Sequence, residues 1–138
     1  MQHFTRLAVW EKAHRLSLAV YRVTQAFPKA ELYGLTGQIR RAVVSIGGNI
    51  AEGRGRISEG DFARFLRYAL GSATELECHL MLAKDLSFLS AESHDTLAQS
   101  TNEVQRMLAA LIRRVEKRKL GSEGVAKSGG EIELGRVS

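Results

Sequence analysis

A seven-residue repeat of apolar side chains in the middle of the chain constrains its fold more than any other feature. The repeat alternates steps of four and three residues and comprises Phe62, Leu66, Ala69, Ala73, Leu76, Leu80 and Ala83. This spacing places every member on one side of an α-helix and is typical of helices that pack against other helices. Ser58, followed three residues later by Asp61, predicts the N-cap of this helix. At 1.5 Å per residue the helix would be ~40 Å long.

Similar apolar stripes predict three more helices. The first, over about residues 7–26, has the stripe Val9, Ala13, Leu16, Val20, Val23 and Phe27, and Pro28 ends it. The second, over about residues 35–52, has the stripe Ile39, Val43, Ile46 and Ile50. The fourth, from about residue 90, has the stripe Leu97, Val104, Leu108, Leu111 and Val115, interrupted by Thr101. Thr36 and Ser90 are candidate caps, and Gly53 with Gly55 supplies the exit of the second helix. The predicted fold class is all-α, a four-helix bundle over residues 1–119.

Length and composition indicate one ordinary globular domain. The chain has 138 residues, of which 44% are hydrophobic and 25% charged. Its apolar stretches are too short for the ~20 residues that cross a bilayer, and its N-terminus lacks a secretory pattern, so we expect a cytoplasmic protein. The single cysteine, Cys78, excludes an intramolecular disulfide and is expected to be a small buried hydrophobe.

The composition changes after Lys119. Five glycines, three serines and no aromatic residue lie between residues 120 and 138. Such a segment buries too little apolar surface to offset the entropy of ordering it, which predicts a disordered, flexible Gly/Ser-rich tail. Its Glu131–Leu134 stretch has the composition of a short docking element.

Small and apolar residues outside the core stripes suggest self-association. They are Val44, Gly47, Gly48 and Ala51 on the second helix and Tyr68, Gly71 and Leu82 on the third. A glycine inside a helix costs about 1 kcal/mol relative to alanine unless it permits close backbone approach. The alternative is that these residues meet another helix of the same bundle.

Positive charge is concentrated on the predicted bundle. The whole chain has a net charge of +5, and residues 1–119 carry +6. The candidate nucleic-acid-binding residues are Arg40, Arg41, Arg54, Arg56, Arg106, Arg113, Lys117 and Arg118. Cations without a base-reading motif predict sequence-tolerant, salt-dependent binding to phosphates. For residues 113–119 the alternative is a solvated helix face, since the helix dipole favours cations at a C-terminus.

The segment Gln38–Gly53, QIRRAVVSIGGNIAEG, resembles the signature of the 23S rRNA intervening-sequence protein family. Three further blocks are similar in content and order: FTRLAVWEKAHRL, FPKAELYGLTGQIRRA and FLRYALGSATELECHL. The resemblance covers about residues 4–115, and departs mildly where Gly47 and Gly48 follow the Ser-Ile pair. It implies a cytoplasmic bacterial protein, an antiparallel up-and-down four-helix bundle and a ring-like homopentamer.

The same resemblance implies a nucleic-acid context without a defined activity. Some relatives accompany reverse transcriptases in retroelements, where they are called accessory variability determinants, and others are encoded inside ribosomal RNA insertions. The residues that match the family's polar signature are Arg41, Asn49, Glu52, Arg56 and Glu75. These residues either form a structural network that fixes helix register or build a pocket in which arginines hold phosphate oxygens.

No catalytic residue or cofactor site is predicted. Glu11 and His14 have the spacing of one half of a di-iron site, but no second Glu-x-x-His occurs. The four histidines show no zinc-ligand spacing with Cys78, and Gly53-x-Gly55 lacks the strand and third glycine of a dinucleotide loop. The expected function is therefore a non-enzymatic oligomeric bundle that binds RNA or DNA and accompanies an enzyme such as a reverse transcriptase. The alternative is a protein–protein scaffold without nucleic-acid binding.

Overall fold

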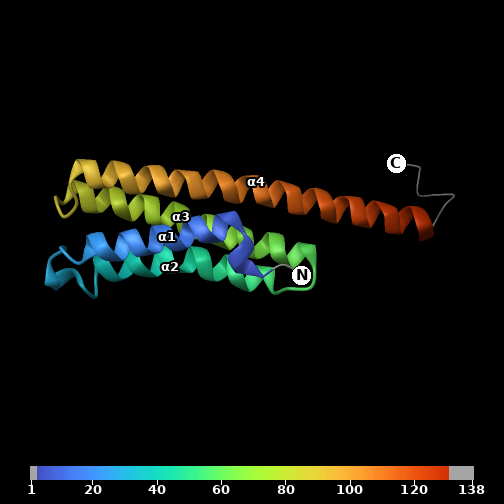
Figure 1. The fold of residues 1–138 in the computed structure, drawn as a ribbon, viewed down its shortest axis with the longest axis horizontal. Coiled ribbons are helices and arrows are strands. Elements are labelled where there is room, and N and C mark those ends of the chain that lie inside the picture. Colours follow the sequence, from blue (N-terminus) through green and yellow to red (C-terminus); the bar gives the residue numbers. More distant parts are fainter. Residues whose placement is uncertain (1–2, 131–138) are drawn as a thin grey trace.

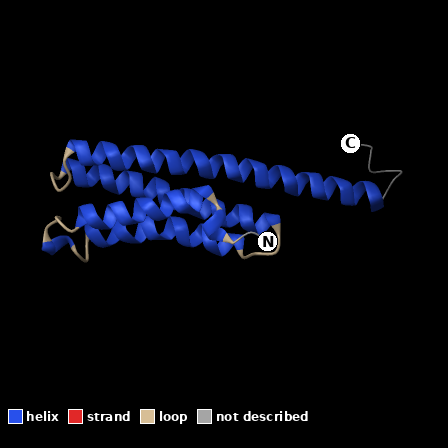
Figure 2. Ribbon diagram, viewed as in Figure 1, coloured by secondary structure: helices blue, strands red, loops and turns tan. Residues whose placement is uncertain are grey.

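The computed structural model describes residues 3–130, and their side chains through residue 121. This part of the chain is helical and contains no strand (Figure 2). Its α-helices are α1 (Ala8–Thr24), α2 (Leu35–Arg54), α3 (Glu59–Asp85) and α4 (Ala91–Gly130). Two short 3₁₀ helices, η1 (Phe4–Arg6) and η2 (Lys29–Glu31), precede α1 and α2.

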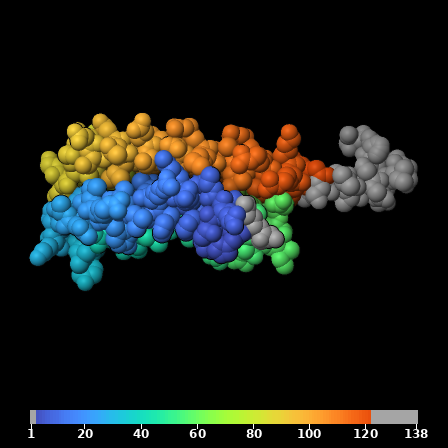
Figure 3. Space-filling model, viewed as in Figure 1, coloured from blue at the N-terminus to red at the C-terminus, as the bar shows by residue number. Residues whose placement is uncertain are grey.

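Successive helices run antiparallel and are neighbours in space (Figure 1). α2 packs against α1 and α3, and α4 packs against α3 and α1, which closes the bundle. α1 is the shortest α-helix and makes the less extensive contacts, whereas the α2–α3 and α3–α4 pairs are closely packed. On the face seen in Figure 3, α1 and α4 cover most of the surface.

The predicted stripes form one hydrophobic core. Every member of the α3 repeat is buried, and the four isoleucine and valine positions of the α2 stripe are completely inaccessible to solvent. In the α1 stripe only Val23 remains half-buried, at the edge of the core. Thr101 interrupts the α4 seam without a polar cost, because its hydroxyl donates to the Leu97 carbonyl at 2.7 Å and is satisfied. The prediction of four amphipathic helices is confirmed.

Two of the three predicted helix caps are present. The Ser58 and Ser90 hydroxyls accept hydrogen bonds from the backbone N–H groups of Asp61 and Ser93, each at 3.0 Å. The prediction for Thr36 is wrong, because α2 already begins at Leu35 and turns the Thr36 side chain toward the core. The Glu31 carboxylate instead accepts from the Leu35 N–H at 3.1 Å.

Replacing Thr36 with valine is expected to stabilise the protein by about 1 kcal/mol. The Thr36 hydroxyl is buried, and its oxygen has no hydrogen-bond partner among the described residues. Valine keeps the side-chain shape and removes the unsatisfied group. Urea denaturation should therefore give a higher midpoint for T36V than for the wild type. T101V removes a hydroxyl that is already hydrogen-bonded, so its midpoint should not rise.

α4 extends into the segment that was predicted to be a flexible tail. The helix continues to Gly130 and extends past the ends of the other three helices (Figure 1). Adding residues to an existing helix requires no new nucleus, which favours continuation even through a glycine-containing segment. Residues 131–138, which include the predicted docking element, lie outside the described residues.

The position of Cys78 corrects the expectation for that residue. The thiol is exposed on α3 and is not part of the core. Cys78 is two residues from Leu76 and Leu80, which are both buried, so the helical period turns it to the opposite side.

Candidate nucleic-acid interface

The predicted cations lie at separate places along the bundle. Arg40 and Arg41 lie in the first half of α2, while Arg54 and Arg56 lie at its C-terminal end. At 1.5 Å per residue, Arg41 and Arg56 are separated by roughly 20 Å along the helix axis. Arg106 is on α4, well before the basic run that ends this helix. The eight residues therefore do not form one patch.

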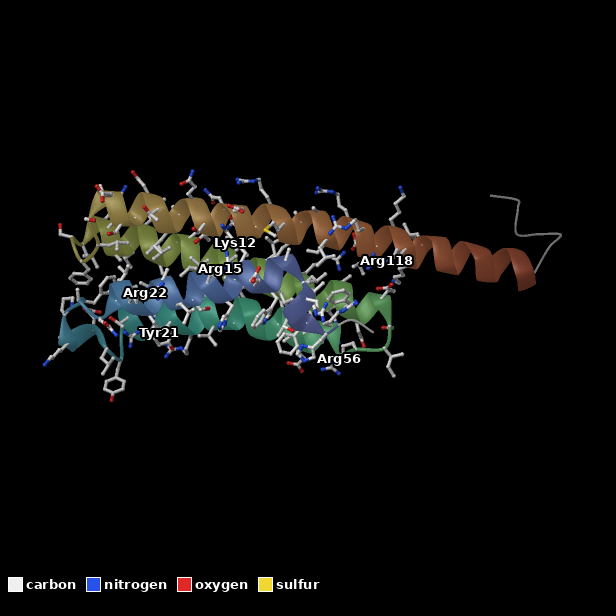
Figure 4. All side chains as sticks on the ribbon, viewed as in Figure 1. Lys12, Arg15, Tyr21, Arg22, Arg56 and Arg118 are labelled. Atoms are coloured by element: carbon white, nitrogen blue, oxygen red, sulfur yellow. The ribbon has the colours of Figure 1, made fainter. Side chains whose placement is uncertain are left out.

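One end of the bundle gathers half of the lysines and arginines of residues 1–119, and we call it the basic end. It consists of residues 52–67, at the α2–α3 connection, and residues 113–119 of α4. The Arg118 Nε atom donates to Glu59 at 3.2 Å, and Arg67 forms an ion pair with Glu116, so α4 is tied directly to α3 there. Arg56 and Arg118 both lie toward this end (Figure 4).

The basic end holds nearly all the excess charge of residues 1–119. Its nine cations are Arg54, Arg56, Arg64, Arg67, Arg113, Arg114, Lys117, Arg118 and Lys119, and its four acids are Glu52, Glu59, Asp61 and Glu116. The resulting excess is +5, out of +6 for residues 1–119. Each acid pairs with one arginine: Glu52 with Arg56, Glu59 with Arg118, Asp61 with Arg64, and Glu116 with Arg67. The cations outside these four ion pairs lie mainly on α4.

Three cations of α4 present their charge to solvent. Arg113, Arg114 and Lys117 are exposed and form no ion pair with any described residue. Nitrogen-tipped side chains project from α4 away from the other helices (Figure 4). Arg106 is likewise exposed and unpaired within the described part of the chain, but it stands apart from the basic end. Arg118, in contrast, is used to hold α4 against α3.

The arginines on the α2–α3 side of the basic end pack against aromatic rings. The Arg56 guanidinium lies 4.7 Å from the Phe65 ring centroid, and Arg54 lies 5.4 Å from that of Phe62. Arg64 also faces Phe65, at 5.1 Å. Hydrogen bonds to Tyr68 and then to Asp61 raise the pKa of the exposed Arg64 guanidinium. These contacts fix the direction of the positive charges.

The five residues of the polar signature form separate small groups. Asn49 donates to the Ser45 carbonyl at 2.9 Å and to its hydroxyl at 3.0 Å, and that hydroxyl lies 2.9 Å from Ser72. This group joins α2 to α3 and fits the structural interpretation. Ser45 and Ser72 were not predicted as members, because only the fold brings these two serines together.

The remaining signature residues lie on either side of this group. Glu52 pairs with Arg56 at 2.8 Å, within the basic end. Glu75 lies 3.3 Å from His79 on α3. Arg41 and Glu75 line one cavity of about 380 Å³, although no hydrogen bond joins them. The geometry therefore supports a structural role for Asn49 and leaves Arg41 available to a ligand.

The predicted oligomer residues lie on two separate surfaces. Val44, Gly47, Gly48 and Ala51 line an apolar groove of about 410 Å³ between α1 and α2, together with Trp10 and Leu18. Val44 is 50% exposed there. Tyr68, Gly71 and Leu82 lie on the outer side of α3, with Tyr68 48% and Leu82 46% exposed. We call these surfaces the α1–α2 groove and the α3 outer face.

Two aromatic residues on the surface were not predicted as site residues from the sequence. Trp10, which belongs to no predicted stripe, stacks on His14 and lines the α1–α2 groove. Tyr33 lies in the connection before α2 and is 94% exposed. An aromatic residue between Pro28 and a helix start was the available signal for Tyr33.

The described residues offer no metal centre or membrane span. No three or more His, Cys, Asp or Glu side chains in this region are arranged to hold a metal ion. None of its helices combines the length and hydropathy that crossing a bilayer requires.

Comparison with known proteins identifies similar chains. The profile of the family described as 23S rRNA-intervening sequence protein matches residues 5–110. A crystal structure from Bacteroides thetaiotaomicron, described as a protein of unknown function from the S23 ribosomal protein family, is similar at 24% sequence identity and a TM-score of 0.72. The match covers 76% of this chain and 98% of that chain, and at this identity it supports the fold alone. The search of curated proteins finds no match.

Proposed function

The chain belongs to the 23S rRNA-intervening sequence protein family, and from this premise we propose that it is a non-enzymatic nucleic-acid-binding protein that acts through its basic end. The observation that carries the proposal is the excess of +5 gathered at one end of the bundle. Arg113, Arg114 and Lys117 supply exposed cations on α4, and Arg67 lies on the neighbouring helix α3, where it pairs with Glu116 of α4.

The chemistry of these groups suits the phosphate backbone. Arginine and lysine neutralise phosphates and release condensed counterions, which gives binding that is strong at low salt and tolerant of sequence. No helix or loop at the basic end carries a recognisable set of base-reading side chains, so the proposed binding positions the protein on RNA or DNA without selecting a sequence.

The triple variant Arg113→Gln, Arg114→Gln, Lys117→Gln tests this proposal. If each cation contacts one phosphate of a duplex, the slope of log K against log salt should shrink by about 2 to 3. Fluorescence anisotropy with a labelled duplex between ~50 and ~200 mM salt measures that slope. A variant with Arg15, Arg22 and Lys84 replaced by glutamine removes the same charge away from the basic end, and should keep the wild-type slope. Equal slopes for wild type and the first variant would count against the basic end as the site.

Assembly into a homo-oligomer forms part of the proposal. The α1–α2 groove and the α3 outer face expose apolar residues on two separate parts of the bundle, which suits a head-to-tail ring of copies. The family resemblance adds the expectation of a pentamer, a bacterial cytoplasmic setting and a role beside a nucleic-acid enzyme such as a reverse transcriptase.

The same apolar surfaces favour a second candidate, a protein scaffold without nucleic-acid binding. In that case a partner protein occupies the α1–α2 groove, and the charge of the basic end only speeds encounter. The two candidates differ in a simple measurement, because partner recovery by a scaffold is insensitive to nuclease treatment, whereas recovery through bound RNA or DNA is lost.

A further inference from the structure

Another hollow lies at the opposite end of the bundle from the basic end. It has a volume of about 680 Å³ and opens between the α1–α2 connection and the first turns of α2. Its walls combine two tyrosines, Tyr21 and Tyr33, with two arginines, Arg40 and Arg41. Volumes of this order are usual for pockets that take a small organic group. We call this hollow the tyrosine pocket.

One wall of the tyrosine pocket is rigid. Arg40 donates from Nε to the Thr24 hydroxyl at 2.9 Å, and its guanidinium lies 4.6 Å from the Tyr21 ring centroid. Thr24 is itself held, because its hydroxyl donates to the Val20 carbonyl at 2.8 Å. The Arg40 side chain therefore joins α1 to α2 and forms a fixed wall of the pocket.

Arg41 is the cation that remains for a ligand. It is exposed and forms no hydrogen bond or ion pair with a described residue. A Cβ atom built on Gly37 would lie 3.2 Å from the Arg41 Nη1 atom, so the arginine lies back across Gly37, one turn earlier on α2. This direction carries the guanidinium toward the α1–α2 connection and the tyrosine pocket.

Tyr33 supplies an uncovered aromatic face beside this cation. Its side chain is 94% exposed, the largest exposure of any aromatic residue in the described region. Leu32, 45% exposed, extends the apolar surface next to it. The nearby carboxylate, Glu31, is occupied as the cap of α2 at Leu35. An anion near this site therefore has Arg41, and not the helix N-terminus, as its partner.

From this juxtaposition we propose that the tyrosine pocket binds one unstacked nucleotide of a single-stranded nucleic acid, with its base on Tyr33 and its phosphate on Arg41. The inference rests on the proposed function and assigns it a second contact point. A base within a duplex is covered on both faces, so only a single strand, a loop or an end can offer a free π-face. Stacking on tyrosine accepts every base, which matches the absence of base-reading groups.

Three nucleic-acid probes and three variants of Tyr33 test the inference. The probes are a short labelled single strand, made as RNA and as DNA, and a blunt duplex of the same sequence. Tyr33→Ala should weaken single-strand binding about tenfold and leave duplex binding unchanged. Tyr33→Phe should bind as the wild type does, whereas Tyr33→Leu, which keeps apolar bulk without a π-face, should behave as the alanine variant.

Arg41→Gln provides an independent readout. If Arg41 contacts one phosphate of the strand, its loss should reduce the single-strand salt slope by about 0.7, while Tyr33→Ala should leave the slope unaltered. Met81→Ala is the surface control, because Met81 is 50% exposed on α3 and lies outside both the tyrosine pocket and the basic end. Tyr33 makes no core contact, so all of these proteins should unfold at the wild-type temperature.

The outcomes separate this inference from the proposed function. Equal single-strand affinity of the wild type and Tyr33→Ala, or an equal loss for single strand and duplex, overturns the tyrosine pocket as a nucleotide site. In either case the glutamine variant of the basic end still reports on the proposed function. A wild-type protein that binds neither probe at low salt overturns both. The RNA and DNA arms show which strand the pocket prefers.

Discussion

Replacing Gly53 with alanine is expected to destabilise the bundle by about 1–3 kcal/mol, although alanine is the better helix former. A Cβ atom at this position would lie 2.6 Å from the Phe65 Cβ atom and 3.2 Å from the Phe62 Cδ1 atom. Because the Phe65 Cβ is fixed to the α3 backbone, no rotation of a side chain can make room. The closely packed α2–α3 pair would have to separate at this point.

Gly48→Ala is the matched control for this substitution. A Cβ atom on Gly48 would meet nothing within 4 Å, so alanine should stabilise the isolated protomer by up to about 1 kcal/mol through helix propensity. Urea denaturation of the two variants beside the wild type measures both effects. Midpoints that shift in the same direction would contradict the close α2–α3 packing at Gly53.

The Gly53 contact also explains how the basic end is built. Arg54 and Arg56 follow this glycine directly, and their guanidinium groups lie over Phe62 and Phe65, the two residues against which Gly53 packs. A closely packed junction between α2 and α3 thus holds these arginines at the same end of the bundle as the cations of α4. Loss of that packing should reduce the affinity for nucleic acid as well as the stability.

The helices and the core could be predicted from the sequence because the spacing of apolar residues indicates which side of a helix is buried. The repeat from Phe62 to Ala83 identified the α3 core positions without reference to any other helix. The spacing of apolar residues does not show at which residue a helix begins. Thr36 has the chemistry of a cap, but a helix that begins one residue earlier turns it inward.

The candidate site was less accessible to sequence reasoning, because its members meet only through the fold. The sequence names Arg118 as a phosphate ligand, yet Glu59, 59 positions away along the chain, is its partner. It also groups Arg41 with Arg40, although one guanidinium is held by Thr24 and Tyr21 while the other remains unpaired. Local pattern identifies charged residues, whereas pairing depends on which helices become neighbours.

Val44→Glu is expected to abolish self-association, if the α1–α2 groove is the contact between copies. A carboxylate placed in a dry apolar interface is left without a partner and costs several kcal/mol, which corresponds to a loss of more than about 100-fold in association. Sedimentation at micromolar concentration should change from the mass of an assembly to that of a protomer. In isolation the variant should fold normally, since Val44 is 50% exposed on the protomer.

Ile57→Glu is the matched control for the assembly test, because Ile57 is more exposed than Val44 but lies outside both apolar surfaces. It should keep the wild-type mass.

Gly48→Ala adds a second criterion for assembly. This variant should gain stability as a protomer, but its added methyl group would crowd a copy bound in the α1–α2 groove. Gly48→Ala should therefore weaken association. If the wild-type protein itself sediments as a protomer, close approach between copies cannot explain the glycine at position 48. Each protomer would then bind nucleic acid through one basic end. The slope of log K against log salt would reflect the few cations of one bundle and not those of a ring.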